Sequence, residues 1–503
     1  MTLRRLQLCA IPTVVGIAFL CDAAAVLAAP PPPKMDQREI IRLLEQRWEK
    51  ASQSLELRNS ISLEEAIKTG LLNNPVLSKA YAELQSTQWQ AIAVRREWFP
   101  FLTSDNPNNA PWAITTETTS GNQSDSRTPL STSQTSRLYT SPRVRLQWSF
   151  LDPTRTPRLK SSLALSQSQQ LLFDVSARDL VLSIQSAYFA LQEAHELRED
   201  YTRIYELTRQ QIERARTLRR AGVGTKGDLD QLRSQLLQQL TQLIQIFQQE
   251  MIAANQLAYT LSLEPGALVS PSERLRPLPA WSSPLQATID EALALREEIR
   301  SSLARADSSG WLSRARLNRY LPLATIIGQT QVTTNALGTG TTLSNGAYSW
   351  NQQNSNYLSN AVGLTFFWLM FDGGIAAADS SNQAYAAESN LAQADVWRYT
   401  ITLQVQNSHA TYVASRMVID TSLEQLRSAR QTVDFTSRNY NGTNIDATTY
   451  IQNIQNYLNA ARNYKSSVRD YNDAISSLYR YSAQWPMASR ANLNERLPAL
   501  KRQ

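Results

Sequence analysis

Val362-Gly-Leu-Thr-Phe-Phe-Trp-Leu-Met-Phe-Asp-Gly-Gly374 joins a strand pattern to a helix pattern, and it has a counterpart earlier in the chain. Its centre, Trp368-Leu-Met-Phe-Asp372, repeats Trp148-Ser-Phe-Leu-Asp152, which lies 220 residues upstream. Gly222 and Gly442 have the same separation. In both copies a short strand runs into a very long helix pattern, a glycine-containing turn and a second helical stretch. This internal repeat predicts a pseudo-symmetric wall rather than a catalytic pocket.

The strand pattern of the first copy alternates strictly between apolar and polar residues over 143–150. The apolar face carries Val144, Leu146, Trp148 and Phe150, the polar face carries Arg143, Arg145 and Gln147, and the second copy continues the apolar face with Leu364, Phe366 and Trp368. A half-buried strand of a soluble sheet shows the same alternation. In an exported protein it is typical of an outer-membrane strand, with its apolar face toward lipid and its polar face toward the lumen.

The N-terminus has the three-part plan of a secretory signal peptide. Arg4 and Arg5 precede an apolar run, and small residues then supply a cleavage site after Ala28. We therefore expect residues 1–28 to be removed and the mature chain to be exported. A membrane anchor is the alternative, but Asp22 cuts the apolar run short of a full span.

The composition excludes several classes of site. Cys9 and Cys21 both lie in the predicted signal peptide, so the mature chain has no cysteine for a disulfide or a metal cluster. His195 and His409 lie in helix patterns of different repeats, and each is expected to decorate a helix. The formal net charge of +7 is spread along the chain without a dense basic block, so nucleic acid is not an expected partner. No metal and no cofactor are expected.

The repeat and the composition shifts divide the chain into six parts. These are the signal peptide at 1–28, an N-terminal tether and helix at 29–61, a first structural repeat at 62–263, a linker at 264–284, a second structural repeat at 285–485 and a C-terminal tail at 486–503. Within the tether region a helix is expected over 36–56. The polar stretch 102–136 predicts a strand and a long loop.

Each repeat contains helices of very unequal length. Helices are predicted at 76–98, 154–220 and 225–262 in the first repeat and at 289–318, 374–438 and 446–483 in the second. At 1.5 Å per residue the longest measures ~100 Å, whereas its return partner measures ~57 Å. The shorter helix before it has about the length needed to cover the overhang. Each repeat therefore predicts one two-stranded coiled coil of even length, which the 3–4 spacing of apolar residues supports.

These features together resemble the TolC-like outer-membrane efflux proteins. The strand-to-helix segment is similar to the family signature, with Leu369 in place of the usual proline, and the first copy has Asp152-Pro-Thr where the family has Asp-Gly-Gly. Ala221-Gly-Val-Gly-Thr-Lys-Gly-Asp-Leu229 and Tyr440-Asn-Gly-Thr-Asn-Ile-Asp446 match the family's periplasmic tips. The resemblance spans about 60–485.

The resemblance implies a mixed α/β membrane protein that assembles as a homotrimer. Each chain would give four strands to one 12-stranded β-barrel in the outer membrane and its helices to one α-helical coiled-coil tunnel through the periplasm. Such a protein is a conduit and not an enzyme. It exports small molecules or polypeptides, as in type I secretion, from an inner-membrane pump through a periplasmic adaptor to the exterior.

The resemblance also implies two kinds of site away from the barrel. The adaptor-contacting tips would be Gly222, Val223, Gly224, Thr225, Gly442, Thr443 and Asn444. A periplasmic gate would lie shortly after the second tip, at Asp446, Thr448 and Ile451. In the family this gate often carries aspartate rings six and nine residues after the turn glycine. Here those positions are Thr448 and Ile451, so packing rather than an acidic ring is expected to hold the gate.

Two alternatives remain open at this stage. A periplasmic coiled-coil scaffold or adaptor without a pore would explain the helices, although it has no use for strands with an apolar face. The second alternative is that the predicted lumen arginines Arg143 and Arg145 pair with carboxylates or reach the headgroup zone instead of lining an open passage.

Overall fold

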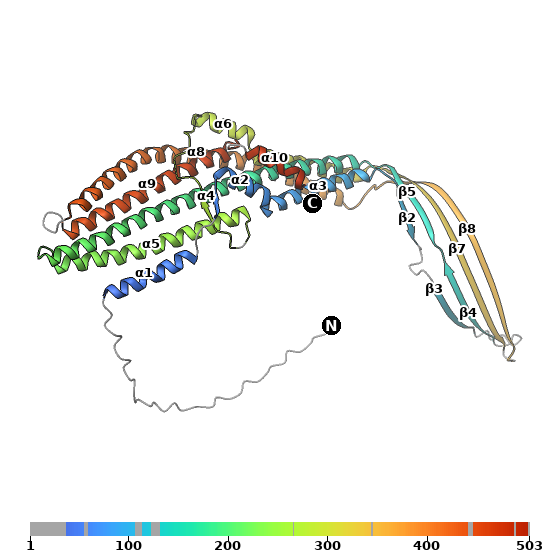
Figure 1. The fold of residues 1–503 in the computed structure, drawn as a ribbon. Coiled ribbons are helices and arrows are strands. Elements are labelled where there is room, and N and C mark those ends of the chain that lie inside the picture. The colour runs from blue at the N-terminus through green and yellow to red at the C-terminus, as the bar shows by residue number, and fades with distance from the viewer. Residues whose placement is uncertain are drawn as a thin grey trace, which may run out of the picture. The chain divides into compact units, whose positions relative to one another are not determined.

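A computed structural model describes residues 37–54, 59–105, 113–121, 131–264, 266–343, 346–440, 446–486 and 489–500. The predicted signal peptide at 1–28 lies outside these residues. The chain divides into two units, Met1–Glu56 and Leu57–Gln503. The described part of the first unit is helix α1 (Gln37–Ser54), which falls within the helix predicted over 36–56 (Figure 1). Among the described residues, no helix combines the length and hydropathy that crossing a membrane requires.

The first helices of the second unit begin and end at local signals in the sequence. They are α2 (Leu63–Asn73), α3 (Pro75–Arg96), α4 (Arg155–Arg220) and α5 (Lys226–Leu261). Ser62 and Glu65 form a capping box at the start of α2, in which each side chain accepts a hydrogen bond from the other's backbone N–H. Asn74 then ends α2 and caps α3 by accepting from the N–H of Val76 at 2.8 Å. The bounds of α3, α4 and α5 lie within two residues of the predicted ones.

The later helices differ from the prediction by a break at Arg296, an earlier start of the helix before it and a helix within the predicted tail. They are α6 (Leu285–Leu295), α7 (Glu297–Leu317), the short 3₁₀ turn η1 (Asn318–Tyr320), α8 (Ile375–Asn439), α9 (Ala447–Tyr481) and α10 (Ser489–Leu500). The single helix predicted at 289–318 is wrong, because Arg296 has an extended ψ of 126° and separates α6 from α7. The Arg296 side chain is buried at this break and holds the carboxylate of Glu298 at 2.6 and 2.8 Å.

Two long helices, α4 and α8, each carry two shorter partners. α3 and α5 both pack on α4, while α7 and α9 both pack on α8. The side-chain amide of Asn74, at the start of α3, donates to the Thr260 carbonyl near the end of α5 at 2.8 Å. α3 and α5 therefore meet end to end along α4, as their lengths predicted. α4 also packs on α7 and α9, which joins the two repeats (Figure 1).

The largest apolar core lies where α2, α3, α4 and α5 meet. Its most deeply buried members are Ile67, Leu71, Leu77, Ile184, Tyr188 and Leu257. Burying one leucine or isoleucine side chain contributes about 1.5–3 kcal/mol relative to leaving it in water. A small parallel sheet lies beside this core and consists of β1 (Asn59–Ile61) and β6 (Val269–Pro271). The predicted linker at 264–284 therefore contains a strand, and the hydroxyl of Tyr188 donates to the Ile61 carbonyl at 3.1 Å.

The larger sheet has six strand segments arranged in four rows. They are β2 (Phe101–Asp105), β3 (Ala113–Gly121), β4 (Ser131–Thr140), β5 (Arg143–Leu151), β7 (Leu323–Leu343) and β8 (Tyr348–Phe367). The first half of β7 pairs with β5 and its second half pairs with β4, while β8 pairs with β7 along its other side. β2 and β3 pair with β5 and β4 respectively. All pairings are antiparallel.

Two strand predictions need correction. The long polar loop expected within 102–136 is wrong in part, because β3 and the first residues of β4 lie there. This stretch is rich in threonine, whose branched side chain suits a strand although its hydroxyl makes the sequence look loop-like. Trp368, which the sequence placed on the apolar strand face, lies just beyond β8, because the strand ends at Phe367.

Candidate functional site

The two faces of β5 differ in exposure as well as in chemistry. Its apolar residues Val144, Leu146, Trp148 and Phe150 are exposed by 41–47%, whereas Arg143, Arg145, Gln147 and Ser149 are half-buried on the opposite face. A strand that exposes its apolar side chains and turns its charged ones inward reverses the usual order in water. The apolar face therefore needs a covering that this chain does not supply among its described residues.

Arg143 and Arg145 have different surroundings on the polar face. Arg143 makes a bidentate ion pair with Asp105 of β2, with N–O distances of 2.9 and 2.7 Å. Asp105 and Arg143 are direct partners in the β2–β5 register. The Nε atom of Arg145 is buried and has no hydrogen-bond partner. The pairing with a carboxylate that the sequence left open is thus present at Arg143.

β8 forms one edge of the sheet and is exposed along its whole length. Every one of its 20 residues is exposed, including Leu364 and Phe366, which are 67% and 63% exposed. Trp368 is 52% exposed beyond the end of the strand. At the opposite edge, β2 and β3 each have a described strand neighbour on one side only. Both edges thus present backbone groups that another sheet can pair with.

The repeated tryptophans make equivalent contacts at the junction of strands and helices. The indole N–H of Trp148 donates to the Trp98 carbonyl at 3.0 Å, and that of Trp368 donates to the Tyr320 carbonyl at 3.0 Å. Trp98 follows α3, and Tyr320 ends η1 after α7. The tryptophan therefore makes the equivalent hydrogen bond in each repeat. Exposed aromatic side chains that also hold a polar partner are typical of the boundary between a membrane and water.

The aspartates of the repeated motif start the two long helices. The Asp372 carboxylate accepts hydrogen bonds from the N–H groups of Gly374 and Ala376 and from the Tyr320 hydroxyl at 2.7 Å. The hydrogen bond from Tyr320, together with those from the backbone N–H groups, lowers the pKa of Asp372 below its ordinary value. Asp152 accepts from the backbone and hydroxyl of Thr154 at 2.9 and 2.7 Å. Gly374 has a φ of +86°, whereas Thr154 has a φ of −80°, so the first copy needs no glycine there.

The first predicted tip is the turn between α4 and α5. Gly222 has a φ of +81°, which favours glycine, and the N–H groups of Val223 and Gly224 both donate to the Leu218 carbonyl. Thr225 begins α5 through a capping box with Asp228. Val223 is 49% exposed. The four predicted tip residues are therefore held in one compact turn.

The second predicted tip is only partly described. Gly442, Thr443 and Asn444 lie outside the described residues, between the end of α8 at Asn439 and the start of α9 at Ala447. Their proposed contact with an adaptor remains a prediction.

The three predicted gate residues have three different roles in this chain. Asp446 caps α9 by accepting from the N–H of Thr449 at 2.8 Å, and the hydrogen bonds from Thr449 lower its pKa. The hydroxyl of Thr448 donates to the side chain of Gln231 on α5 at 3.3 Å. Ile451 is half-buried. The Asp446 carboxylate thus caps its own helix, while Thr448 connects the hairpin of α8 and α9 to the hairpin of α4 and α5.

Stronger contacts between these two hairpins were not predicted from the sequence. Lys465 of α9 lies 2.6 Å from the Asp200 carboxylate of α4, and the Tyr457 hydroxyl donates to the same carboxylate at 3.2 Å. Burial and then the nearby Asp200 raise the pKa of Tyr457 to about 12, so its hydroxyl keeps its proton. Lys465 lies beside the apolar row of α9, four residues after Ala461 and three before Val468. A lysine next to this core-facing row is the sequence signal that could have indicated a buried acidic partner.

Further inter-hairpin contacts lie on either side of this ion pair. Toward the tips, Gln211 and Arg214 of α4 both donate to the Ser437 carbonyl of α8, at 3.0 and 2.7 Å. In the other direction, Arg469 of α9 holds Glu193 of α4 at 2.7 Å. We refer to Asp200, Lys465 and Tyr457 as the central link.

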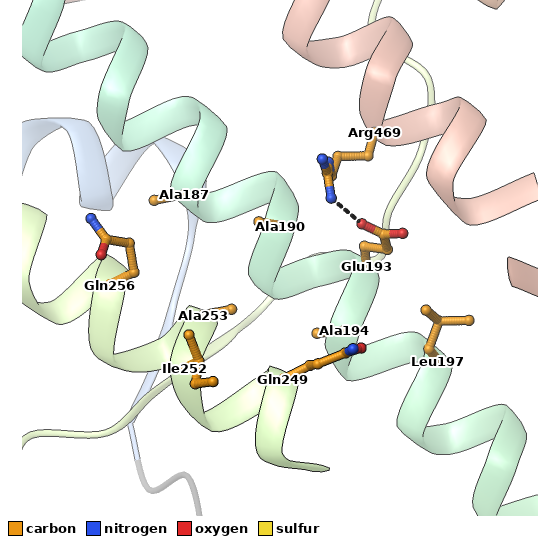
Figure 2. Close-up of a pocket in the computed structure, with 10 residues that line it drawn as sticks. All are labelled: Ala187, Ala190, Glu193, Ala194, Leu197, Gln249, Ile252, Ala253, Gln256 and Arg469. Atoms are coloured by element: carbon orange, nitrogen blue, oxygen red, sulfur yellow. Dashed lines mark hydrogen bonds and ion pairs between the residues drawn. The ribbon is translucent and has the colours of Figure 1, made fainter. Parts of the chain in front are cut away.

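A groove of about 460 Å³ lies next to the pair of Arg469 and Glu193. Figure 2 shows its wall of small α4 side chains facing α5. The lining residues are Ala187, Ala190, Glu193, Ala194, Leu197, Gln249, Ile252, Ala253, Gln256 and Arg469. A mostly apolar floor with amides at its rim suits packing contacts. Among the described residues, no group of histidines and carboxylates is arranged to hold a metal ion.

Solved structures with the same fold are outer-membrane channels. The outer-membrane channel OprN shares 19% identity and a TM-score of 0.65, over 86% of this chain and 95% of that one. The CmeC outer-membrane channel of Campylobacter jejuni shares 16% identity and a TM-score of 0.68, over 88% and 92%. VceC, an outer membrane protein of Vibrio cholerae, shares 15% identity and a TM-score of 0.62, over 84% and 96%. No protein-family model and no curated protein sequence matches the chain.

The molecule thus joins a four-row sheet with an exposed apolar face to a pair of long helical hairpins. This is the fold of the TolC-like outer-membrane efflux channels, and the resemblance drawn from the sequence is confirmed at the level of the fold. The matches cover nearly all of those channels, so the likeness includes the strands as well as the helices.

Proposed function

We propose that this chain is one subunit of a homotrimeric channel-tunnel in the outer membrane. Its four sheet rows would form a third of a 12-stranded barrel, and its helices would form a third of a tunnel through the periplasm. The tunnel would receive small molecules or polypeptides from an inner-membrane pump through a periplasmic adaptor and release them outside the cell. The fold shared with outer-membrane channels supports this proposal.

The larger, six-stranded sheet is the feature on which the proposal rests. Its β5 face exposes a row of large apolar side chains, and its two edges have strand partners on one side only among the described residues. In lipid, an unpaired backbone N–H or C=O costs several kcal/mol, so the edges must be closed by further strands. Copies of the same chain supply them, since β8 of one copy can pair with β2 and β3 of the next.

The helices support the periplasmic part of the proposal. α4 has 66 residues and α8 has 65, so each measures roughly 100 Å at 1.5 Å per residue. α8 also exposes apolar side chains along much of its length, including Tyr385, Tyr399, Met417 and Phe435, which are 63–81% exposed. A neighbouring subunit would cover this stripe, because a surface of this extent is unusual on a monomer.

The central link supports a gated passage. It fastens α9 to α4 through Lys465, Asp200 and Tyr457, all of which are buried. While these contacts are intact, the hairpin of α8 and α9 remains packed against the hairpin of α4 and α5. Opening the tunnel would require this link to separate, so the fastened state corresponds to a closed tunnel.

Membrane fractionation and native mass determination test the proposal. The mature protein is expected in the outer-membrane fraction and as a trimer in mild detergent. A periplasmic scaffold without a pore would instead be recovered in the soluble periplasmic fraction. Recovery as a soluble monomer would overturn the proposal, and planar-bilayer conductance of the purified trimer would show whether the assembly contains a pore.

A further inference from the structure

Hydrogen bonds within the chain hold the turn of the first hairpin tip. The N–H groups of Val223 and Gly224 donate to the Leu218 carbonyl at 3.1 and 3.2 Å. On the α5 side, Thr225 and Asp228 exchange capping hydrogen bonds, the Asp228 N–H donating to the Thr225 hydroxyl at 3.1 Å. The conformation of this turn is therefore determined by hydrogen bonds within the chain.

Three glycines lie at the tip, and the fold of the turn explains two of them. Gly222 has a φ of +81°, and a Cβ atom on Gly224 would lie only 3.1 Å from the Arg219 backbone nitrogen. Gly227 is different. A Cβ atom there would meet only the Thr225 hydroxyl, at an ordinary distance of 3.6 Å. Glycine is a poor residue in the first turn of a helix, and nothing within this tip requires it at Gly227.

The tip also carries three cations without acidic partners. Arg219, Arg220 and Lys226 are exposed, and no ion pair joins them to a carboxylate of the described residues. Nearby arginines differ in this respect: Arg216 pairs with Glu213, and Arg233 pairs with Asp230. No acidic residue occurs over 217–227.

Helix electrostatics explain part of this charge. Arg219 and Arg220 occupy the last turn of α4, where the helix dipole favours cations. Lys226 occupies the first position of α5, where the same dipole disfavours a cation. Lys226 and Gly227 are thus adjacent residues that each oppose the local preference of their own helix. Residues that oppose the local preferences of a helix occur mainly where a surface binds a partner.

We propose that this basic tip patch, formed by Arg219, Arg220 and Lys226 around Gly227, docks an acidic helical tip of a protein partner. The proposal rests on the proposed function, in which the tip meets a periplasmic adaptor, and it specifies the chemistry of that contact. Carboxylates of the partner would face the three cations. Gly227 would let the partner's backbone or a bulky side chain approach α5 closely, and the exposed Val223 would provide an apolar contact beside the charges.

An anionic membrane surface would also attract three cations, but it gives no reason for glycine at Gly227. Attraction to lipid headgroups depends on the number of charges and not on a residue without a side chain between them. A protein tip needs both the charge and the close approach. The patch therefore favours a protein partner.

Binding of two synthetic hairpin peptides tests the proposal with the full-length trimer in detergent. One helical hairpin carries four glutamates around its turn, and the matched hairpin carries four lysines at the same positions. We expect the acidic hairpin to bind about tenfold tighter or more at low salt, and this preference to shrink as salt screens the charges. Fluorescence anisotropy of labelled hairpins measures both affinities.

Three variants separate charge from contact. The combined change Arg219→Glu, Arg220→Glu and Lys226→Glu should reverse the preference. A control with the same change in net charge, Arg209→Glu, Arg427→Glu and Arg430→Glu, should keep it. Gly227→Leu should weaken binding of the acidic hairpin about tenfold without changing the charge of the tip.

Four results would overturn the proposal. They are equal binding of the two hairpins, an unchanged preference after reversal of the three tip charges, reversal by the control changes, or full binding by the Gly227→Leu protein. Binding of phosphatidylglycerol vesicles that is as tight as the acidic hairpin and insensitive to Gly227→Leu would assign the patch to a membrane. Planar-bilayer conductance of the same preparations reports on the channel separately, so loss of the docking proposal is distinguishable from loss of the proposed function.

Discussion

Asp372 shows why the repeated motif ends in an aspartate. Its carboxylate accepts from two N–H groups at the start of α8 and from the Tyr320 hydroxyl, so one side chain joins the strand end, η1 and the helix. We expect Asp372→Ala to lower the thermal unfolding midpoint by a few degrees, because these helix-start donors lose their acceptor. Asp379→Ala is the matched control. Asp379 lies on the same helix and has only a long 3.7 Å contact with Arg319, so its removal should leave the midpoint nearly unchanged.

Asp473 gives α9 a dependence on pH. Burial raises the pKa of this carboxyl to about 6, although Arg469 opposes the shift, and Glu193 of α4 faces the same cluster. A carboxyl whose pKa rises on folding stabilises the fold below its unfolded pKa of 3.8 and loses that contribution as the pH rises through about 6. We expect the thermal midpoint to fall as the pH rises from about 4 to about 6. Asp473→Asn should remove a contribution of at most about 3 kcal/mol, at ~1.4 kcal/mol per pKa unit.

Asp395 of α8 provides the control for this prediction. Its side chain is 60% exposed, so Asp395→Asn should leave the pH dependence close to that of the wild type. Thermal unfolding of the detergent-solubilised protein across this pH range distinguishes the two variants. If Asp473→Asn kept the full pH dependence, another titrating group would be responsible.

At the scale of the helices and strands, the regular elements were predictable and the interruptions were not. The bounds of α4, α5, α8 and α9 lie within two residues of those predicted, because long apolar periodicity is a strong signal. The break at Arg296 was missed, since an arginine inside a helix pattern gives no local signal and its bonds to Glu298 exist only in the folded chain. β3 was missed because its threonines resemble a polar loop.

The candidate sites divide in the same way. The apolar face of β5 and the first tip followed from spacing and glycine. The central link did not, because Asp200 and Lys465 are 265 residues apart, and only folding brings them together. The partner of Arg143 likewise depends on the β2–β5 register, which the sequence does not specify.

The central link should control how easily the second hairpin moves. Lys465→Met leaves the buried Asp200 with Tyr457 and a long 3.8 Å contact with Arg203, and removal of one member of a buried ion pair costs about 3 kcal/mol. We expect a lower thermal midpoint and a higher mean conductance in planar bilayers, because α9 separates from α4 more readily. Arg398→Met, which removes an exposed ion pair with Asp395, is the control and should change neither quantity. Unchanged conductance in Lys465→Met would remove the link from the gate.

The first tip gives an independent prediction at Gly222. Its φ of +81° is strained for any side chain, but no atom lies within 4 Å of the Cβ position, so a large residue would project outward. Gly222→Trp should therefore abolish export while the trimer and its outer-membrane location persist. Export measured in cells, together with fractionation of the same cells, checks this prediction. Normal export by the variant would rule out docking at this turn.

At the scale of the whole assembly, three copies of the polar strand face would line the barrel. The Nε atom of Arg145 has no hydrogen-bond partner among the described residues, whereas Asp105 balances the charge of Arg143. Arg145→Ser should shift the reversal potential in a salt gradient toward cation preference. Arg143→Ser should shift it the same way, because it leaves Asp105 without its counter-ion. Planar-bilayer recordings measure both shifts, and an unchanged potential in both variants would place these side chains outside the passage.

The central position of β7 has a consequence for the order in which the molecule folds. β8 begins five residues after β7 ends, so this pairing closes locally, whereas Arg143 of β5 must find Gln331 of β7 across 188 residues. Such distant pairings are slow, because the entropy of closing the loop is lost before any contact forms. Docking of α4 against α7 shortens that search, since α4 begins four residues after β5 ends and β7 begins three residues after η1 ends. We therefore expect the helices to dock before the distant strand pairings of the sheet are completed.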